Sequence, residues 1–146
     1  MNTNDLFGRK RMNLKYLLLV FALVLCGACT DNMKIRGQAD KLAMTLDDYG
    51  ADMRWGRYNK AYGYHVNTDG TKPEADLDRL EGFSVTSFTP GDAILNADVT
   101  EAVVPIEIKY YDEQYGMLRS LKQTQKWWFD VKSKSWFVES DFPYLK

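Results

Sequence analysis

The chain has 146 residues, 45% hydrophobic and 27% charged, with 19 Lys and Arg against 20 Asp and Glu. This composition is typical of a folded globular protein, and the length suits one domain with a short extension. A net charge of −1 provides no field that would collect nucleic acid, so no nucleic-acid partner is expected. Two Cys and one His are too few for a disulfide scaffold or a zinc site, and we expect neither a metal nor a cofactor.

The first 28 residues have the layout of an export signal. Residues 1–15 contain four basic residues and one acidic residue, and the apolar run YLLLVFALVL follows at residues 16–25. A helix of ten residues is about 15 Å long, about half the thickness of a bilayer core, which makes this run too short for a permanent membrane span. A basic segment before a short apolar segment is typical of a signal peptide.

The sequence LCGACT at residues 25–30 resembles the recognition sequence of bacterial lipoprotein signal peptides, which places small residues before a cysteine. In that family the chain is cut before the cysteine, whose sulfur receives a diacylglyceryl thioether and whose new amine is acylated, commonly with palmitate. The resemblance implies cleavage between Ala28 and Cys29, with lipid attachment at Cys29. Cys26 stands where the family usually has Leu, which departs from the pattern. The alternative is an ordinary secreted or membrane-anchored protein with two incidental thiols.

Thr30 follows the expected lipidated cysteine. In enterobacterial lipoproteins an Asp there favours retention in the inner membrane, so the resemblance implies the periplasmic face of the outer membrane, with the inner membrane as the alternative. Loss of residues 1–28 removes four basic residues and one acidic residue and leaves a net charge of −4. A mildly acidic domain held by acyl chains is expected to stand off from anionic lipid.

We expect residues 29–35 to form a tether and residues 36–146 to form a single α+β domain. Its first element is a helix over about 38–62, since apolar residues recur at spacings of three and four from Ala39 to Met53. Gly50 is expected to bend this helix, and Asp52 is expected on its solvated side. A turn over residues 67–73 and a short helix over 74–80 follow.

After Gly82 the apolar period changes from about 3.6 to 2, which predicts an antiparallel meander of four or five strands. The expected strands span residues 83–88, 94–99, 103–111, 117–131 and 136–142. The third alternates most regularly. Its expected inward side chains are Val104, Ile106, Ile108 and Tyr110. Pro105 lacks a backbone N–H and is expected at a sheet edge or a bulge.

A helix followed by a curved antiparallel sheet resembles the cystatin-like and nuclear-transport-factor-2-like (NTF2-like) α+β cone. The resemblance covers residues 36–142 and includes the last hairpin, in which KWWFDV at 126–131 precedes SWFVE at 135–139. This hairpin looks like the closing hairpin of small lipoproteins with that fold. The resemblance implies a pocket between the helix and the concave face of the sheet.

Five side chains are candidates for lining this pocket, because they share the inward faces of the last two strands. They are Arg119, Gln123, Gln125, Trp127 and Trp136. Inward polar groups need partners or water, and a ligand at the pocket mouth would supply them. A strand whose early half extends beyond the helix, or a bulge that reverses parity, would also explain them. Filling a small core is the commoner use of the two Trp side chains.

Two further predictions concern surface and catalytic residues. Trp128 and Phe137 have the opposite parity, so we expect them to face outward as a contact for a partner. His65 is the candidate general base of a dehydratase-like or isomerase-like enzyme, although its place before a turn disfavours catalysis. The sequence thus favours an envelope lipoprotein whose non-catalytic domain binds an envelope protein or a small apolar ligand. A structural subunit of an envelope complex is a further alternative.

Overall fold

The computed structural model describes the backbone of residues 14–146 and the side chains from Met33 onward. The chain divides into two units, Met1–Lys34 and Ile35–Lys146. Ala28 and Cys29 lie outside the described side chains, so the signal peptide, its cleavage site and the tether stay predictions. From Met33 onward, where the side chains are described, no helix combines the length and the apolar character that crossing a membrane requires.

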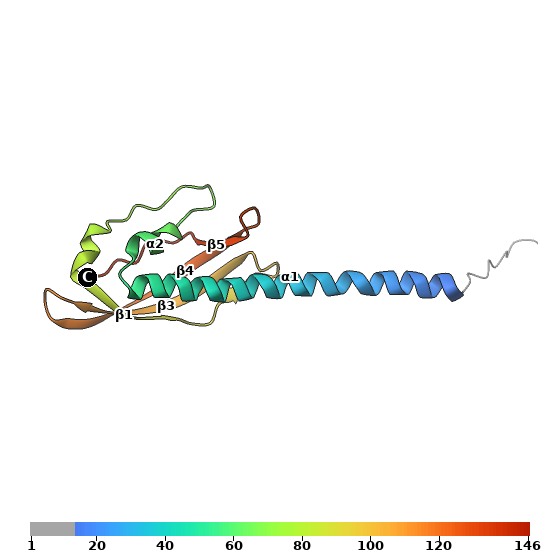
Figure 1. The fold of residues 1–146 in the computed structure, drawn as a ribbon, viewed down its shortest axis with the longest axis horizontal. Helices are drawn as coiled ribbons and strands as arrows, with labels where there is room; N and C mark the ends of the chain where they lie inside the picture. The colour runs from blue at the N-terminus through green and yellow to red at the C-terminus, as the bar shows by residue number, and fades with distance from the viewer. Residues whose placement is uncertain (1–13) are drawn as a thin grey trace, which may run out of the picture. The chain divides into compact units, whose positions relative to one another are not determined.

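In the second unit, helix α1 (Leu14–Arg54) lies along the sheet (Figure 1) and buries one apolar stripe. The stripe recurs at intervals of three and four residues, as the sequence predicts for a helix with one buried face. Its fully or nearly fully buried members are Leu42, Leu46, Tyr49 and Met53. The expected helix over 38–62 is two elements, because α1 ends at Arg54 and α2 (Tyr58–Gly63) follows.

Gly56 separates the two helices, whereas α1 runs through Gly50 without a break. Gly56 has φ +66°, and its N–H donates to the carbonyl of Met53 while the N–H of Arg57 donates to that of Asp52. This pair of bonds is a Schellman motif, which favours glycine at the left-handed position. The helix is therefore interrupted at Gly56 and not at Gly50.

Asp52 is buried, contrary to the solvated position expected for it. The Schellman turn folds the chain back over the last helical turn and brings Arg57 beside Asp52. The Nε of Arg57 lies 2.6 Å from Oδ1 of Asp52. The carboxylate of Asp52 can be buried because the turn places the guanidinium of Arg57 beside it. Helical periodicity alone does not reveal this partner.

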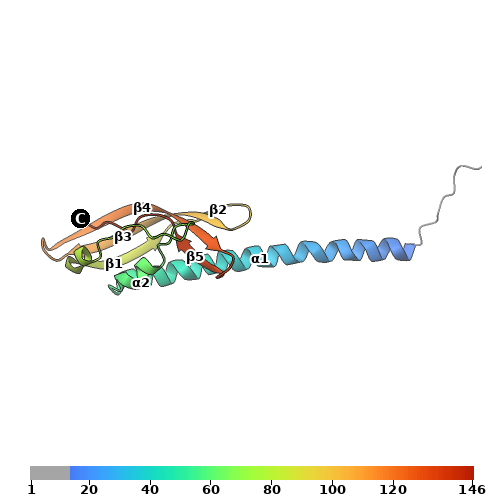
Figure 2. The same cartoon turned by 90° about the horizontal axis from the view of Figure 1, so that it is seen from above.

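Five strands form one antiparallel sheet that curls around α1 (Figures 1 and 2). The strands are β1 (Phe83–Pro90), β2 (Ile94–Leu95), β3 (Glu101–Asp112), β4 (Met117–Asp130) and β5 (Ser135–Val138). Their order is β1-β3-β4-β5, and β2 pairs with β3. The α+β class, and a helix packed on a curved antiparallel sheet, are confirmed.

Three expected elements are shorter than predicted or displaced. β2 stops at Leu95 because the chain turns before Val99, which has φ +53°. β5 stops at Val138, although Phe142 beyond it is still buried. The short helix expected over 74–80 is a 3₁₀ helix, η1, over Asp78–Gly82.

Pro105 lies in β3, which is paired on both sides, and the irregularity of register lies between Val85 and Ser87 instead. β3 is therefore not an edge strand, but Pro105 itself has a ladder partner only in β4, because β1 pairs with β3 from Ile106 onward and β2 only up to Val103. The carbonyl of Pro105 accepts a bond of 2.8 Å from the N–H of Gly91. In an antiparallel strand the backbone N and O of one residue point toward the same neighbouring strand. The nitrogen of Pro105 therefore points to the side where β1 has ended and β2 has not yet begun. No ladder hydrogen bond is lost there, although proline has no N–H.

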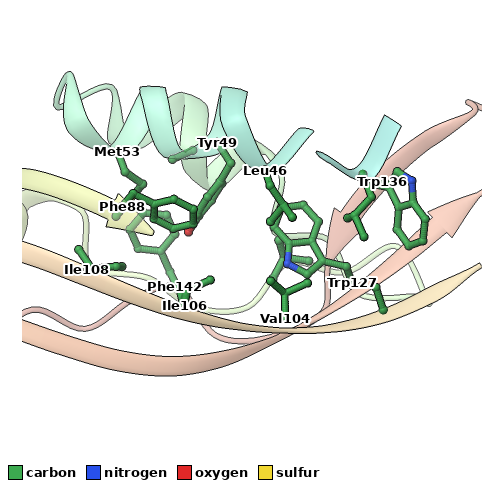
Figure 3. Close-up of a cluster of buried hydrophobic side chains, with 14 of the residues drawn as sticks. Leu46, Tyr49, Met53, Phe88, Val104, Ile106, Ile108, Trp127, Trp136 and Phe142 are labelled. Carbon is green, nitrogen blue, oxygen red and sulfur yellow. The ribbon is translucent and has the colours of Figure 1, made fainter. Parts of the chain in front are cut away.

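The core lies between α1 and the inner face of the sheet (Figure 3). The predicted inward residues of β3 are all buried, as are Trp127 and Trp136. The C-terminal segment, residues 139–146, also packs on this face: Phe142, Pro143 and Leu145 are buried. The hydroxyl of Tyr110 donates to the carbonyl of Lys146 over 2.8 Å. The segment therefore leads from β5 back to the inner side of β3.

Candidate functional site

His65, the candidate base, lies in the core with no exposed surface. The segment after α2 forms a parallel bridge beside β5, in which the N–H of Val66 donates to the carbonyl of Val138 over 3.0 Å. The N–H of Val138 in turn donates to the carbonyl of Tyr64 over 2.8 Å. This pairing extends the sheet by one short segment and holds His65 with its neighbours in the packed interior.

Both ring nitrogens of His65 have partners. Nδ1 lies 2.8 Å from the carbonyl of Ser140, which can only accept, so Nδ1 carries the proton in the neutral ring. Nε2 therefore accepts from the hydroxyl of Tyr49 over 3.1 Å. The side-chain amide of Gln125 donates to the same hydroxyl over 3.3 Å. We call these four residues, Gln125, Tyr49, His65 and Ser140, the buried polar chain.

Burial shifts the pKa values of the two titratable members of this chain. The loss of water lowers the pKa of His65 from 6.5 to about 4, against smaller opposing effects of the Ser140 carbonyl and Asp141. Burial also raises the pKa of Tyr49 well above its usual value, and the bond with Gln125 offsets a small part. Both groups are therefore neutral near pH 7, which suits a structural role in an apolar interior.

A general base must reach the proton that it abstracts. His65 presents no atom to solvent, and the nitrogen free to accept a proton is already bonded to Tyr49. Phe142 packs against the ring, with centroids 5.0 Å apart. A substrate could reach His65 only after the core had opened, so the geometry disfavours the enzyme alternative.

The five candidate pocket residues have separate surroundings. Trp127 is fully buried and meets the ring of Tyr49 edge-on at 5.7 Å. The indole N–H of Trp136 donates to the carbonyl of Gln38 over 3.0 Å. Both Trp side chains are core residues under α1 (Figure 3).

The polar candidates contact other parts of the chain, but Oε1 of Gln125 and Nε of Arg119 are buried without a hydrogen-bond partner among the described residues. Gln125 is fully buried and belongs to the buried polar chain, and Gln123 donates to the carbonyl of Asp141 over 3.0 Å. The Nε of Arg119 lies 3.2 Å from a carboxylate oxygen of Asp112. The structure therefore does not bring the five together around one cavity, and distant parts of the chain occupy the place expected for a ligand.

The inward parity of β4 holds in its second half and fails at its ends. Met117 and Val131 share the parity of the buried Trp127, but they are 49% and 65% exposed. Met117 lies at the end of the long β3–β4 hairpin, and Val131 lies in the turn that follows Asp130. The early half of β4 is partly exposed, which agrees with the alternative that this half extends into solvent.

Trp128 and Phe137 lie on the outer face of the sheet as predicted, and both are half-buried. Their ring centroids are 5.4 Å apart. The indole N–H of Trp128 donates to the carbonyl of Val66 over 2.7 Å, which fixes its ring. The pair is thus ordered by intramolecular contacts and still open on one side.

Two exposed apolar residues lie on the same face of the sheet, in the next row of paired residues, where Val103 is opposite Lys126. Val103 of β3 is 40% exposed and is paired with Ile94 of β2, which is 71% exposed. We call Ile94, Val103, Trp128 and Phe137 the outer-face patch. The ion pair between Lys126 and Glu139, at 2.7 Å, lies beside it. The sequence analysis missed the first two residues, although the alternation in β3 that buries Val104 places Val103 outside.

A groove of about 430 Å³ lies where α1 ends beside the start of β1. Trp55, which is 75% exposed, and the half-buried Tyr58 and Phe83 supply its aromatic wall. Glu81 and Glu113 supply carboxylates. The sequence analysis did not bring these residues together, because they come from segments far apart in the chain.

The candidate regions differ in access and chemistry. The buried polar chain is enclosed, whereas the outer-face patch and the groove beside Trp55 are open to solvent. Within the residues that the structure describes, no group of three or more His, Cys, Asp and Glu is arranged to hold a metal ion. No protein-family model, no curated protein and no solved structure matches the chain.

Proposed function

We propose that this chain is a lipid-anchored protein of the bacterial envelope whose α+β domain binds another envelope protein. The anchor is supported by the basic segment, the apolar run and the sequence LCGACT at residues 25–30. Acylation at Cys29 would tether the domain to the periplasmic face of the outer membrane, and several acyl chains would make that attachment stable.

A binding role at the outer surface is supported by one main observation: side chains of the domain itself fill the inner face of the sheet. Tyr49, His65 and Phe142 occupy the space under α1 where a cone-shaped fold would hold a ligand. We propose that the domain is a cystatin-like or NTF2-like cone closed by its own C-terminal segment. A small apolar ligand would have to displace that segment, so a protein partner on the outside is favoured.

The outer-face patch is the proposed contact. It combines two ordered aromatic rings with two exposed aliphatic side chains, and a Lys–Glu ion pair lies beside it. Apolar and aromatic centres with polar rims are typical of protein interfaces. This arrangement also fits the alternative of a structural subunit in an envelope complex, which is a partner-binding role of the same kind.

The anchor is tested by replacing each cysteine separately. Cys29→Ser should block acylation and leave a precursor that is heavier by the mass of residues 1–28, measured by intact mass spectrometry. Cys26→Ser is the matched control and should be processed normally. Normal processing of Cys29→Ser, or mature protein that keeps its leader and lacks fatty acid, would contradict the proposed anchor.

The contact is tested by crosslinking in cells, followed by identification of partners by mass spectrometry. Val103→Ser with Phe137→Ser should abolish the crosslink that the wild-type chain forms. Trp128 is left unchanged, because its bond to Val66 contributes to folding. Tyr115→Ser with Leu118→Ser removes apolar residues from the opposite hairpin and should keep the crosslink. Loss of the crosslink in the control alone would refute the proposed contact.

A further inference from the structure

The end of the second unit where its helix begins carries a basic cluster. Arg36 and Lys41 come from α1, and Lys132 and Lys134 come from the turn between β4 and β5; all four are exposed. The Nζ of Lys41 lies 3.5 Å from the carbonyl of Lys134, which places the turn beside the helix. Two segments that are far apart in sequence thus contribute positive charge to one region, which we call the basic end.

Ordered contacts hold the turn in this position. The bond from the Trp136 indole to the carbonyl of Gln38 joins the start of β5 to α1. The carboxylate of Asp130 accepts from the backbone N–H groups of Lys132 and Ser133, at 3.1 and 3.0 Å. These bonds fix the turn and leave Val131 projecting at its tip, 65% exposed.

The charge of the basic end differs from that of the remaining domain. The nearby acidic residues on the same segments are Asp40 and Asp130, and Asp130 is bonded within the turn. Apart from the four basic-end residues, positions 35–146 contain 10 basic and 18 acidic residues. The domain is therefore acidic overall but basic at one end, so its net charge alone does not predict how it meets a charged surface.

The chain length between the proposed anchor and the basic end limits their separation. Arg36 follows Cys29 by seven residues, and even a fully extended chain of that length spans at most about 25 Å. The field of an anionic leaflet decays over about 8–10 Å at physiological salt, so the part of the domain nearest the anchor interacts with it most strongly.

We propose that the basic end binds anionic phospholipid head groups, with Val131 entering the membrane interface. This inference rests on the proposed lipid anchor. It orients the domain with the β4–β5 turn toward the bilayer and the β3–β4 hairpin away from it, since β3 has twelve residues and a strand of that length spans roughly 35–40 Å.

The test uses the acylated chain from Cys29 onward, reconstituted into vesicles of phosphatidylcholine with or without phosphatidylglycerol. Val131→Cys and, separately, Tyr115→Cys carry a fluorescent label, and a lipid with a spin-labelled head group serves as the quencher. The label at position 131 should be quenched severalfold more than the label at 115. Quenching at 131 should rise with phosphatidylglycerol and fall when salt is added.

Charge-reversal variants distinguish binding by the basic end from a general effect of the net charge of the domain. Lys132→Glu with Lys134→Glu should reduce quenching at position 131 to the level at 115. Lys109→Glu with Lys122→Glu makes the same charge change on the outer face of the sheet and should leave the quenching at 131 nearly unchanged. Equal loss in both variants, or no dependence on phosphatidylglycerol, would overturn the orientation.

The intact mass of the purified chain is measured before reconstitution. A mass with acyl chains at Cys29, combined with equal quenching at both labels, overturns the orientation and leaves the anchor standing. A mass without acyl chains overturns the proposed anchor, and the orientation that rests on it fails as well. Circular dichroism spectra of the charge-reversal variants should match the wild-type spectrum, because all four replaced lysines are exposed.

Discussion

Lowering the pH should destabilise the domain through His65. Burial holds the pKa of this ring at about 4, against an ordinary value of 6.5. Because the folded-state pKa is depressed, the unfolded chain binds the proton more readily and protonation favours unfolding. The stability associated with the neutral ring is fully present above pH 6.5 and is lost as the pH falls from 6.5 toward 4.

The size of the loss follows from the difference between the two pKa values. At about 1.4 kcal/mol per pH unit, His65 should lower the free energy of unfolding by about 2 kcal/mol at pH 5 and by about 3 kcal/mol at pH 4. The ring is fully buried, so solvent screening does not reduce this effect appreciably. Such a loss is a substantial part of the stability of an ordinary domain.

Urea unfolding between pH 7.5 and 4 measures the effect, with His65→Gln as the reference that cannot titrate. The wild type should lose more stability than the variant by the amounts given above. Because the variant lacks the native ring and could fold poorly, the ring is also titrated directly by NMR, which is unambiguous since the chain has one His. A ring pKa near 6.5 in the folded protein would refute the reasoning.

Two further predictions concern core packing and the buried polar chain. Gly50→Ala should lower the free energy of unfolding by about 1–3 kcal/mol, since its Cβ would lie 2.5 Å from the Phe88 ring; Gly37→Ala, whose Cβ meets nothing within 4 Å, should raise it by up to about 1 kcal/mol. Equal effects in urea unfolding would contradict the packing argument. Tyr49→Phe should cost about 1–3 kcal/mol because Nε2 of His65 loses its donor, and an unchanged unfolding midpoint would count against that bond.

Local periodicity predicted the elements with one buried face. The stripe from Leu42 to Met53 and the alternation from Val104 to Tyr110 are both buried as expected. These patterns are set by a repeating geometry, 3.6 residues per turn or two per pleat, so the sequence shows them directly. The outward position of Trp128 and Phe137 follows from the same rule.

Contacts between distant segments were not predictable in this way. Gln125 meets Tyr49 across 76 positions, and Arg57 meets Asp52 only because the Schellman turn reverses the chain. Each contact gives a polar side chain a partner from another segment, although Oε1 of Gln125 has none among the described residues. Pro105 is another residue whose surroundings the sequence did not reveal. It fits within β3 because β1 and β2, the strands on its other side, are interrupted opposite it.

The C-terminal segment decides where this domain can be approached. To open the inner face, Phe142 and Leu145 would have to leave the core, at a cost of about 1.5–3 kcal/mol for each large apolar side chain. The bonds that join His65 to Ser140 and Tyr110 to Lys146 would also break. Together these losses approach the whole stability of a typical small domain. A partner could bind the inner face only if its own contacts compensated for these losses. We therefore expect a partner to bind the outer face of the sheet.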